Sequence, residues 1–194
     1  MFIFKARLLF IFTFVTHLYS QTMQVNLNKV VSVHYKLHVH DGNTTNEEFV
    51  EETQSSEPMV FLFGSGNLLP SFEINLEGLA AGDSFDFNLT PDQGYGDSTP
   101  ENVVKLPMEA FVGPGEELDS EMINTGSFVP MIDEDGNQLQ GMVLDIKPDH
   151  IVMDFNHPLA GKHLHFAGTV SNVREANAEE LSHGHVHGAG GHHH

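Results

Sequence analysis

The chain has 194 residues, 40% of them apolar, which is enough for one ordinary domain or two small ones with a buried core. Its 27 acidic and 8 basic side chains give a net charge of -19, which repels phosphate and argues against nucleic-acid binding. The absence of cysteine excludes disulfides, thiolate zinc sites and cysteine nucleophiles, so any metal must be held by histidine or carboxylate.

The first twenty-two residues differ from the rest of the chain. Lys5 and Arg7 precede an apolar run over residues 8–15, and the small residue Ser20 follows, which is the pattern of a signal peptide. The run is shorter than the roughly 20 residues that a membrane-spanning helix needs. In a rival interpretation the protein starts at Met23 and residues 1–22 are a spurious extension. The residues alone leave both interpretations open.

Residues 25–39 are expected to form a half-buried strand, because apolar and polar side chains alternate there. One face of this strand carries Val31, Val33, Tyr35, Leu37 and Val39. A loop with Asp41-Gly42 leads to a second extended segment, "FVEET", which completes an exposed hairpin.

The next part of the chain predicts a strand, a glycine turn and a short helix over residues 70–76, which ends towards Gly78 and Gly82. Alternation in "DSFDFNL" predicts another strand. The following stretch, "TPDQGYGDSTPENVVKLP", has prolines and glycines on both sides of Tyr95, so an irregular, shaped loop is expected.

From residue 106 to residue 152 the pattern changes to short strands separated by Asp135-Gly136 and Pro148-Asp149 turns, which predicts a small β unit of its own. One more strand is expected within "HPLAGKHLHFAGTVSNVREA". The polar segment "NAEELSHGH" after it is expected to fray.

No nucleophile elbow, phosphate-binding loop, dinucleotide fingerprint or helical zinc-protease motif is present. The strings "DQGYGD", "LLPSFEINLEG", "NHPLAGKHLHF" and "EELSHGHVHG", in this order, resemble the SlyD-like branch of the FKBP-type peptidyl-prolyl isomerases. The resemblance runs from Met23 to the last histidine. It implies an α+β, mostly β fold, in which a half-barrel sheet wraps a short helix and a small β domain is inserted in the flap.

The resemblance also implies a division of the chain and a set of site residues. The isomerase domain would comprise residues 23–105 and 153–178, the inserted domain residues 106–152, and a flexible His-rich tail residues 179–194. The implied catalytic residues are Tyr35, Glu51, Phe72, Tyr95 and Phe166, and the implied substrate-binding residues are Met59, Phe61, Leu68 and Leu69. Taken one at a time, these side chains are better explained as ordinary core, but taken together in the order of the family they favour a prolyl pocket.

Two residues depart from the family pattern. The family commonly has aspartate where Glu51 stands, and glycine where Ser71 precedes Phe72. Glu51 keeps the carboxylate on a longer side chain, so its expected hydrogen bond to Tyr35 is open to rearrangement. These departures and the histidines motivate a second hypothesis, a non-catalytic holdase or metallochaperone on an FKBP scaffold.

The chemistry of prolyl isomerisation explains the missing acid, base and nucleophile. Rotation about an X-Pro amide crosses a barrier of about 18–20 kcal/mol, because the planar form is stabilised by resonance. An apolar cavity that desolvates the amide favours the twisted state, so no cofactor is required. The resemblance implies that Tyr95 donates its hydroxyl to the substrate carbonyl and that Phe72 forms the floor of the pocket.

The inserted region carries four methionines whose flexible side chains suit the binding of unfolded segments, although a small β core would use them equally well. They are Met108, Met122, Met131 and Met142. Chaperone activity there is a family implication. The expected partners are unfolded or proline-containing polypeptides and nickel-enzyme maturation proteins, and the chain is expected to be a monomer.

The histidines at the end of the chain alternate with glycine and valine, unlike an unbroken purification tag. Neutral imidazoles on such a segment can surround a borderline cation, and nickel is the metal of the family, with Zn(II) or Cu(II) as alternatives. The expected ligands are His183, His185, His187, His192, His193 and His194. His157, His163 and His165 are expected to belong to the folded domain and are not among the expected ligands.

The resemblance bears on localisation as well, because chains of this family usually begin a few residues before a strand like the one at Val30-Val31-Ser32. Met23 occupies that place. A cytoplasmic protein is therefore expected, and a periplasmic or secreted protein is the alternative if residues 1–20 act as a signal peptide.

Overall fold

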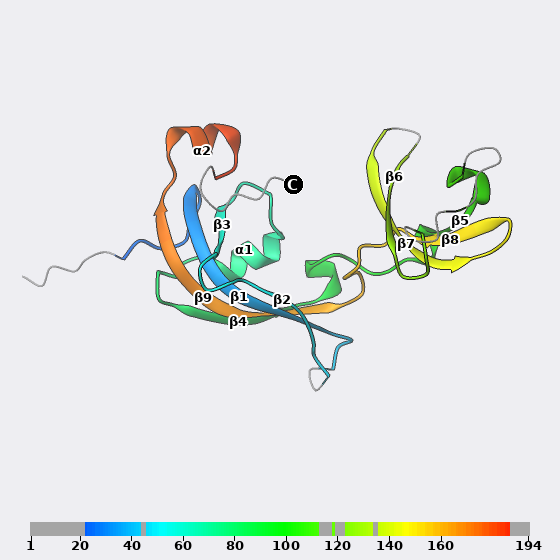
Figure 1. Cartoon of the computed structure of the whole chain (residues 1–194). Helices are drawn as coiled ribbons and strands as arrows, with labels where there is room; N and C mark the ends of the chain where they lie inside the picture. The colour runs from blue at the N-terminus through cyan, green and yellow to red at the C-terminus, as the bar shows by residue number, and fades with distance from the viewer. Residues whose placement is uncertain (1–21, 44–45, 113–117, 119–122, 134–135, 187–194) are drawn as a thin grey trace, which may run out of the picture.

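The computed structural model describes residues 22–43, 46–112, 118, 123–133 and 136–186. In Figure 1 they form two lobes, each built on an antiparallel sheet. Strands dominate and the helices are short, which confirms the expected α+β, mostly β fold class. The expectations for residues 1–21, Met122, His187, His192, His193 and His194 lie outside the described residues.

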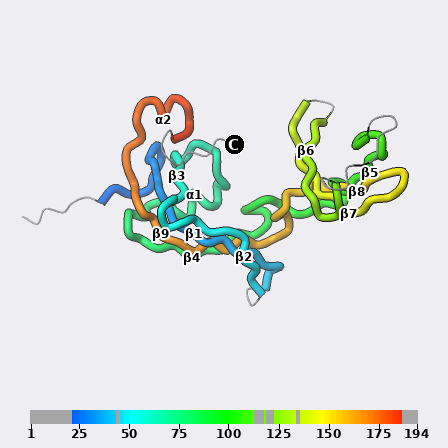
Figure 2. The backbone as a smooth tube through the Cα atoms, viewed as in Figure 1, coloured from blue at the N-terminus to red at the C-terminus, as the bar shows by residue number. Residues whose placement is uncertain are grey.

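The larger lobe is organised around a long central strand, β1 (Lys29–His40). Strand β9 (His163–Glu175) pairs with β1 along one whole edge, and β4 (Ser84–Leu89) pairs with β9 on the far side. The other edge of β1 is shared by β3 (Met59–Leu62), which pairs with its first half, and β2 (Glu48–Glu52), which pairs with its second half. Figure 2 shows this sheet as a curved layer.

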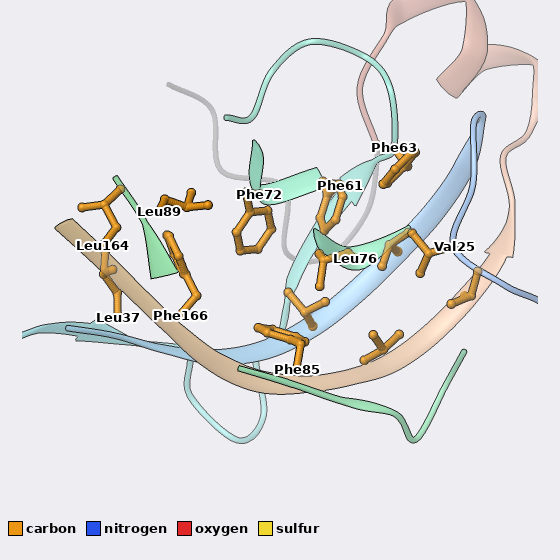
Figure 3. Packing of buried hydrophobic residues seen from close by; sticks show 14 of the residues in the cluster. Val25, Leu37, Phe61, Phe63, Phe72, Leu76, Phe85, Leu89, Leu164 and Phe166 are labelled. Atoms are coloured by element: carbon orange, nitrogen blue, oxygen red, sulfur yellow. The ribbon is translucent and has the colours of Figure 1, made fainter. Parts of the chain in front are cut away.

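Helix α1 (Pro70–Leu76) lies on the concave side of the main sheet. Its bounds agree with the predicted helix, because proline stands at its first position and Gly78, with a φ of 83°, follows its end. Phe72 and Leu76 are buried against the sheet, and burial of each stabilises the fold by about 2 kcal/mol. Figure 3 shows both side chains among the core residues of β1, β3 and β9.

The face predicted for the first strand is also confirmed. Its four aliphatic residues, Val31, Val33, Leu37 and Val39, are buried in the core of the larger lobe, and Tyr35 packs against that core. The alternation of β1 therefore fixes which side of the sheet faces α1.

The smaller lobe has a sheet of order β5-β8-β7-β6. Its strands are β5 (Val103–Pro107), β6 (Phe128–Ile132), β7 (Gln138–Ile146) and β8 (His150–Asp154). Val143, Ile151 and Met153 form its buried core. The predicted turns near Gly136 and Pro148 join β6 to β7 and β7 to β8.

Strand β5 corrects the expected organisation of the chain. Residues 103–107 were expected to end an irregular loop, but they pair with β8 along their whole length. The loop itself contains two short 3-10 helices, η1 (Pro91–Gln93) and η2 (Pro100–Asn102), and a third, η3 (Met108–Ala110), follows β5. The sheet of the smaller lobe therefore spans Val103 to Asp154, beyond the expected range of 106–152 at both ends.

Helix α2 (Ala178–His183) is a second correction, because this segment was expected to fray. The Asn177 side chain accepts a hydrogen bond from the Glu180 backbone N–H, and the Glu180 carboxylate accepts one from the Asn177 N–H, which makes a capping box. Arg174 of β9 donates to both oxygens of the same carboxylate, at 2.9 and 2.6 Å. An ion pair between the buried Glu180 carboxylate and the partly exposed Arg174 thus fastens α2 to the sheet.

Among the residues that the structure describes, no helix is both long and apolar enough to cross a membrane.

Candidate active site

The ring of Phe72 is the centre of an aromatic cluster between α1 and the main sheet. Its centroid lies 4.9 Å from that of Phe166 and 6.3 Å from that of Tyr35, both in edge-to-face arrangements. Phe61 of β3 makes a third such contact at 6.2 Å. Strands β1, β3 and β9 therefore bring three further predicted site residues around the Phe72 ring. Figure 3 shows Phe61 and Phe166 beside it.

Two further phenylalanines of this cluster were not predicted as site residues. Phe87 lies 5.8 Å from Phe72 and 5.7 Å from Phe166, and Phe85 lies 6.4 Å from Phe72, all between ring centroids. Both belong to β4, whose alternating pattern was recognised in "DSFDFNL". The alternation predicted that they share one face of a strand, but it did not predict that this face packs against α1.

Tyr35 and Glu51 form the polar side of the site. The Tyr35 hydroxyl donates to Glu51 Oε1 at 2.5 Å, and the Tyr35 backbone N–H donates to Thr53 Oγ1 at 3.0 Å. The register of β1 and β2 places Glu51 opposite Leu37, so the longer glutamate side chain still reaches the hydroxyl. Burial, and then the Glu51 carboxylate, raise the pKa of Tyr35, which keeps the phenol protonated.

Tyr95 stands in the loop after η1 and is 40% exposed. Its ring stacks on that of His157, with centroids 3.6 Å apart and an interplanar angle of 8°. Burial, and then the Glu51 charge, raise the pKa of Tyr95, so its hydroxyl is also a permanent donor at neutral pH.

His157 was assigned to the folded domain without a role in the site, and its stacking on Tyr95 was not predicted. Burial lowers the pKa of His157, which favours the neutral ring. Its Nδ1 accepts a hydrogen bond from the Leu159 N–H at 3.1 Å, and the Gly161 N–H donates to the Gly96 carbonyl at 2.7 Å. The Gly161–Gly96 bond and the stacking of His157 on Tyr95 tie the Tyr95 loop to the segment that precedes β9.

The remaining predicted residues surround the same cluster. Met59, Leu68 and Leu69 are partly buried and pack against the core of the larger lobe, to which Phe61, Phe72 and Phe166 belong. All nine predicted catalytic and substrate-binding residues therefore lie in the larger lobe, either in its core, packed against that core, or hydrogen-bonded or electrostatically coupled to residues that are. They are Tyr35, Glu51, Met59, Phe61, Leu68, Leu69, Phe72, Tyr95 and Phe166.

Of the predicted tail ligands, only His183 and His185 fall within the described residues. His183 is the last residue of α2, and its ring stacks on that of His185 with centroids 5.7 Å apart. The Gly184 carbonyl between them accepts a hydrogen bond from Asn67, so this part of the tail lies against the larger lobe.

The fold and this cluster agree with a sequence match. A family model described as FKBP-type peptidyl-prolyl cis-trans isomerase matches residues 21–125, which include all nine predicted site residues except Phe166. The chain belongs to this family, whose members catalyse rotation about prolyl peptide bonds.

Within the family, the chain is similar to the SlyD enzymes. It is 36% identical to FKBP-type peptidyl-prolyl cis-trans isomerase SlyD of Haemophilus influenzae over 167 residues, 86% of this chain and 82% of that protein. Identity to SlyD of Yersinia pestis is 39% over 166 residues, and to SlyD of Escherichia coli K12 37% over 167 residues; each match covers 86% of this chain and 79% of the relative. The resemblance to the SlyD-like branch is confirmed, and so is the isomerase activity it implies.

Proposed function

We propose that isomerisation takes place over the Phe72 cluster, with Phe72 and Phe166 as the floor of the pocket and Tyr35, Glu51 and Tyr95 at its polar side. Met59, Phe61, Leu68 and Leu69 form the apolar walls. The observation that carries the proposal is the convergence of five aromatic rings on Phe72 beside a hydrogen-bonded Tyr35–Glu51 pair.

The physical basis of this site is differential stabilisation of the twisted amide. A planar prolyl amide has charge separated between oxygen and nitrogen, which an apolar environment disfavours, whereas the twisted amide has lost that separation. The Tyr95 hydroxyl holds the carbonyl without taking part in proton transfer. No cofactor is needed for this reaction.

The test is a cis-to-trans assay on an Ala-Leu-Pro-Phe type peptide. The wild-type chain is expected to accelerate the reaction well above the uncatalysed rate, and Tyr95→Ala is expected to remove most of that acceleration. A wild-type rate equal to background would instead support the non-catalytic holdase, while an unchanged rate in Tyr95→Ala would place the reaction elsewhere.

We propose further that the smaller lobe binds unfolded segments of the substrate. Its sheet exposes Ile132 by 70% and Leu139 by 41%, and these residues line a groove of about 410 Å³ together with Met131, Val104 and Phe155. Met108 packs instead against the buried core of this lobe. An apolar groove bordered by a flexible thioether suits polypeptides of varied sequence.

The histidine tail is proposed to bind Ni(II), with Zn(II) or Cu(II) as alternatives. The support is the density of imidazoles from His183 onward, together with the proximity of the His183 and His185 rings. Replacement of all six tail histidines by asparagine should sharply reduce nickel bound per chain and leave peptide isomerisation unchanged. An unchanged nickel stoichiometry would refute this assignment.

We also propose a monomeric, cytoplasmic protein that starts at Met23 and serves proline-containing clients, nickel-enzyme maturation proteins among them. The mass of the protein purified from its own cells tests the localisation. A mature start at Met23 supports it, and a start at Gln21 contradicts it and favours export. Sedimentation of the purified chain tests the monomer.

A further inference from the structure

Four histidines face each other on the side of the main sheet away from α1. The register of β1 and β9 pairs His38 with His165 and His40 with His163. Their neighbours along the strands, such as Leu37 and Leu164, belong to the core (Figure 3). Because side chains alternate along a strand, these histidines are on the outer face. His40 and His163 stack with centroids 5.0 Å apart.

The carboxylate of Glu47 lies close to one of these pairs, His38 and His165. One potential ligand atom from each of His38, Glu47 and His165 can be chosen so that all three lie within 4.8 Å of one another. A register shift in the pairing of β1 with β2 begins at His38, and Glu47 immediately precedes β2. The hairpin therefore folds this carboxylate back over the cross-strand histidine pair.

His165 is held between two carboxylates. Its Nδ1 lies 2.9 Å from Glu47 Oε1, and its Nε2 lies 3.1 Å from Asp86 Oδ1 of β4. The side chains of His165 and Glu47 are only 20% and 24% exposed. Metal-bound histidines commonly donate their second ring N–H to a carboxylate, which orients the ring and strengthens the ligand. Asp86 stands where such a carboxylate is needed.

The donor set decides the class of ion. Two imidazole nitrogens and one carboxylate oxygen, with a fourth position open to water, suit Zn(II) and related borderline transition metals rather than Mg(II) or Ca(II). Ligand atoms around zinc lie roughly 3.4 Å apart, because each is about 2.1 Å from the ion. The 2.9 Å between His165 Nδ1 and Glu47 Oε1 is below this spacing and the 4.8 Å limit of the group is above it, so the ligand atoms would have to shift to hold an ion. The net charge of -19 favours a cation.

We propose that His38, Glu47 and His165 bind one divalent transition-metal ion, such as zinc, on the outer face of the main sheet, and that Asp86 orients His165. This site is separate from the proposed nickel tail. Arg174, which anchors α2, is nine positions further along β9 than His165, and at ~3.3 Å per residue the two are roughly 30 Å apart. His183 at the end of α2 is therefore not within coordination distance of this site.

A protonated His165 is the alternative to a bound metal ion. Burial by itself would lower the pKa of His165, but its hydrogen bonds to Glu47 and Asp86 raise it above the ordinary value. An imidazolium between two carboxylates would use the same geometry without an ion. The two interpretations differ in one respect, because only a metal site requires His38.

The experiment counts zinc ions bound to the full chain in which the six tail histidines are asparagine. Equilibrium dialysis against Zn(II) alone, followed by elemental analysis, is expected to give one ion per chain with micromolar or tighter affinity. His38→Asn and His165→Asn should each abolish this ion, and Asp86→Asn should weaken it by roughly 10- to 100-fold. Binding of no zinc, or of one zinc by every variant, overturns the proposal.

His150→Asn is the matched control. His150 Nδ1 lies 2.8 Å from the Asp149 carboxylate, a histidine–carboxylate pair like that of His165 but not part of the three-residue group, so its loss should leave the zinc stoichiometry unchanged. Circular dichroism verifies the fold of each variant. If His165→Asn does not fold, Glu47→Gln carries the test, because it keeps the shape of the side chain and removes only the ligand charge. The readout is independent of isomerisation and of the tail.

Discussion

At the scale of single residues, Phe72 and Tyr95 differ in burial: Phe72 is buried in the core, whereas Tyr95 is partly exposed. Phe72 is 3% exposed and touches five rings, so its removal would leave a cavity and destabilise the fold by about 3–5 kcal/mol as well as altering the pocket. Tyr95 is 40% exposed, and among the described residues its ring stacks only on that of His157. Tyr95 is therefore the residue at which catalysis can be changed without loss of the core.

If Tyr95 donates to the reacting carbonyl as proposed, Tyr95→Phe should lower kcat/KM for a proline-containing tetrapeptide by about tenfold, because it removes one hydrogen bond of ~1.4 kcal/mol. The phenyl ring still stacks on His157 and still covers the pocket, so the free energy of unfolding should change little. Peptide kinetics and urea denaturation measure the two effects. A fall in activity matched by a fall in stability would point to a structural role instead.

Glu51→Gln tests the polar side of the site through the tyrosine pKa values. The Glu51 charge raises the pKa of both Tyr35 and Tyr95, so neutralising it should lower both values. Burial is the larger cause in each case, so both should stay above the ordinary tyrosine value. Tyrosinate absorbance during alkaline titration measures this, with Tyr35→Phe and Tyr95→Phe to assign the transitions. Unchanged midpoints would mean that the carboxylate is not close to the hydroxyls.

At the scale of elements, Arg174→Ala should release α2 from the sheet. The Glu180 side chain is 1% exposed and would lose its charged partner. Because Arg174 itself is 42% exposed, water screens part of the pair, and a cost of about 2 kcal/mol is expected. Hydrogen exchange of the α2 amides should speed up.

The exposed pair Lys36–Glu52 offers a matched control on the same sheet. Both side chains are about half exposed, so Lys36→Ala should change the free energy of unfolding by less than about 0.5 kcal/mol. If the two substitutions had equal effects, Arg174 would not anchor the helix.

Elements with a strong periodic pattern could be predicted from the sequence, whereas those defined by a distant partner could not. The alternation of β1 and the proline and glycine around α1 are local signals. By contrast, β5 is a strand because β8 pairs with it, and α2 is held by Arg174 from β9. The capping box from Asn177 to Glu180 and Gly184 after the last turn are local signs of α2, but they do not show what holds it in place.

The same limit applies to the site. Resemblance placed nine residues together, but the stacking of His157 on Tyr95 depends on two loops that meet in space. Gly168 is a similar case, because a Cβ there would lie 2.1 Å from the His34 carbonyl oxygen across the β1–β9 pair. Neither contact leaves a periodic pattern, so neither could be predicted from spacing alone.

At the scale of the whole molecule, the two lobes have separate cores and expose different surfaces. Within the described residues, the core of the larger lobe is centred on α1, and that of the smaller lobe on β7 and β8. Separate cores allow the surface of one lobe to be changed without disturbing the pocket of the other. Folding assistance and peptide turnover should therefore be separable by mutation.

Ile132→Ser combined with Leu139→Ser should slow the catalysed refolding of a protein whose folding is limited by a prolyl bond. The apolar groove would lose its two most exposed walls, and binding of the unfolded chain would weaken, whereas tetrapeptide turnover should stay within about twofold. Leu181→Ser is the matched control, since Leu181 is 46% exposed on α2 in the larger lobe. Equal slowing by the control, or none by the double variant, would mean that the groove does not bind the substrate, and that the larger lobe alone selects the prolyl bonds on which it acts.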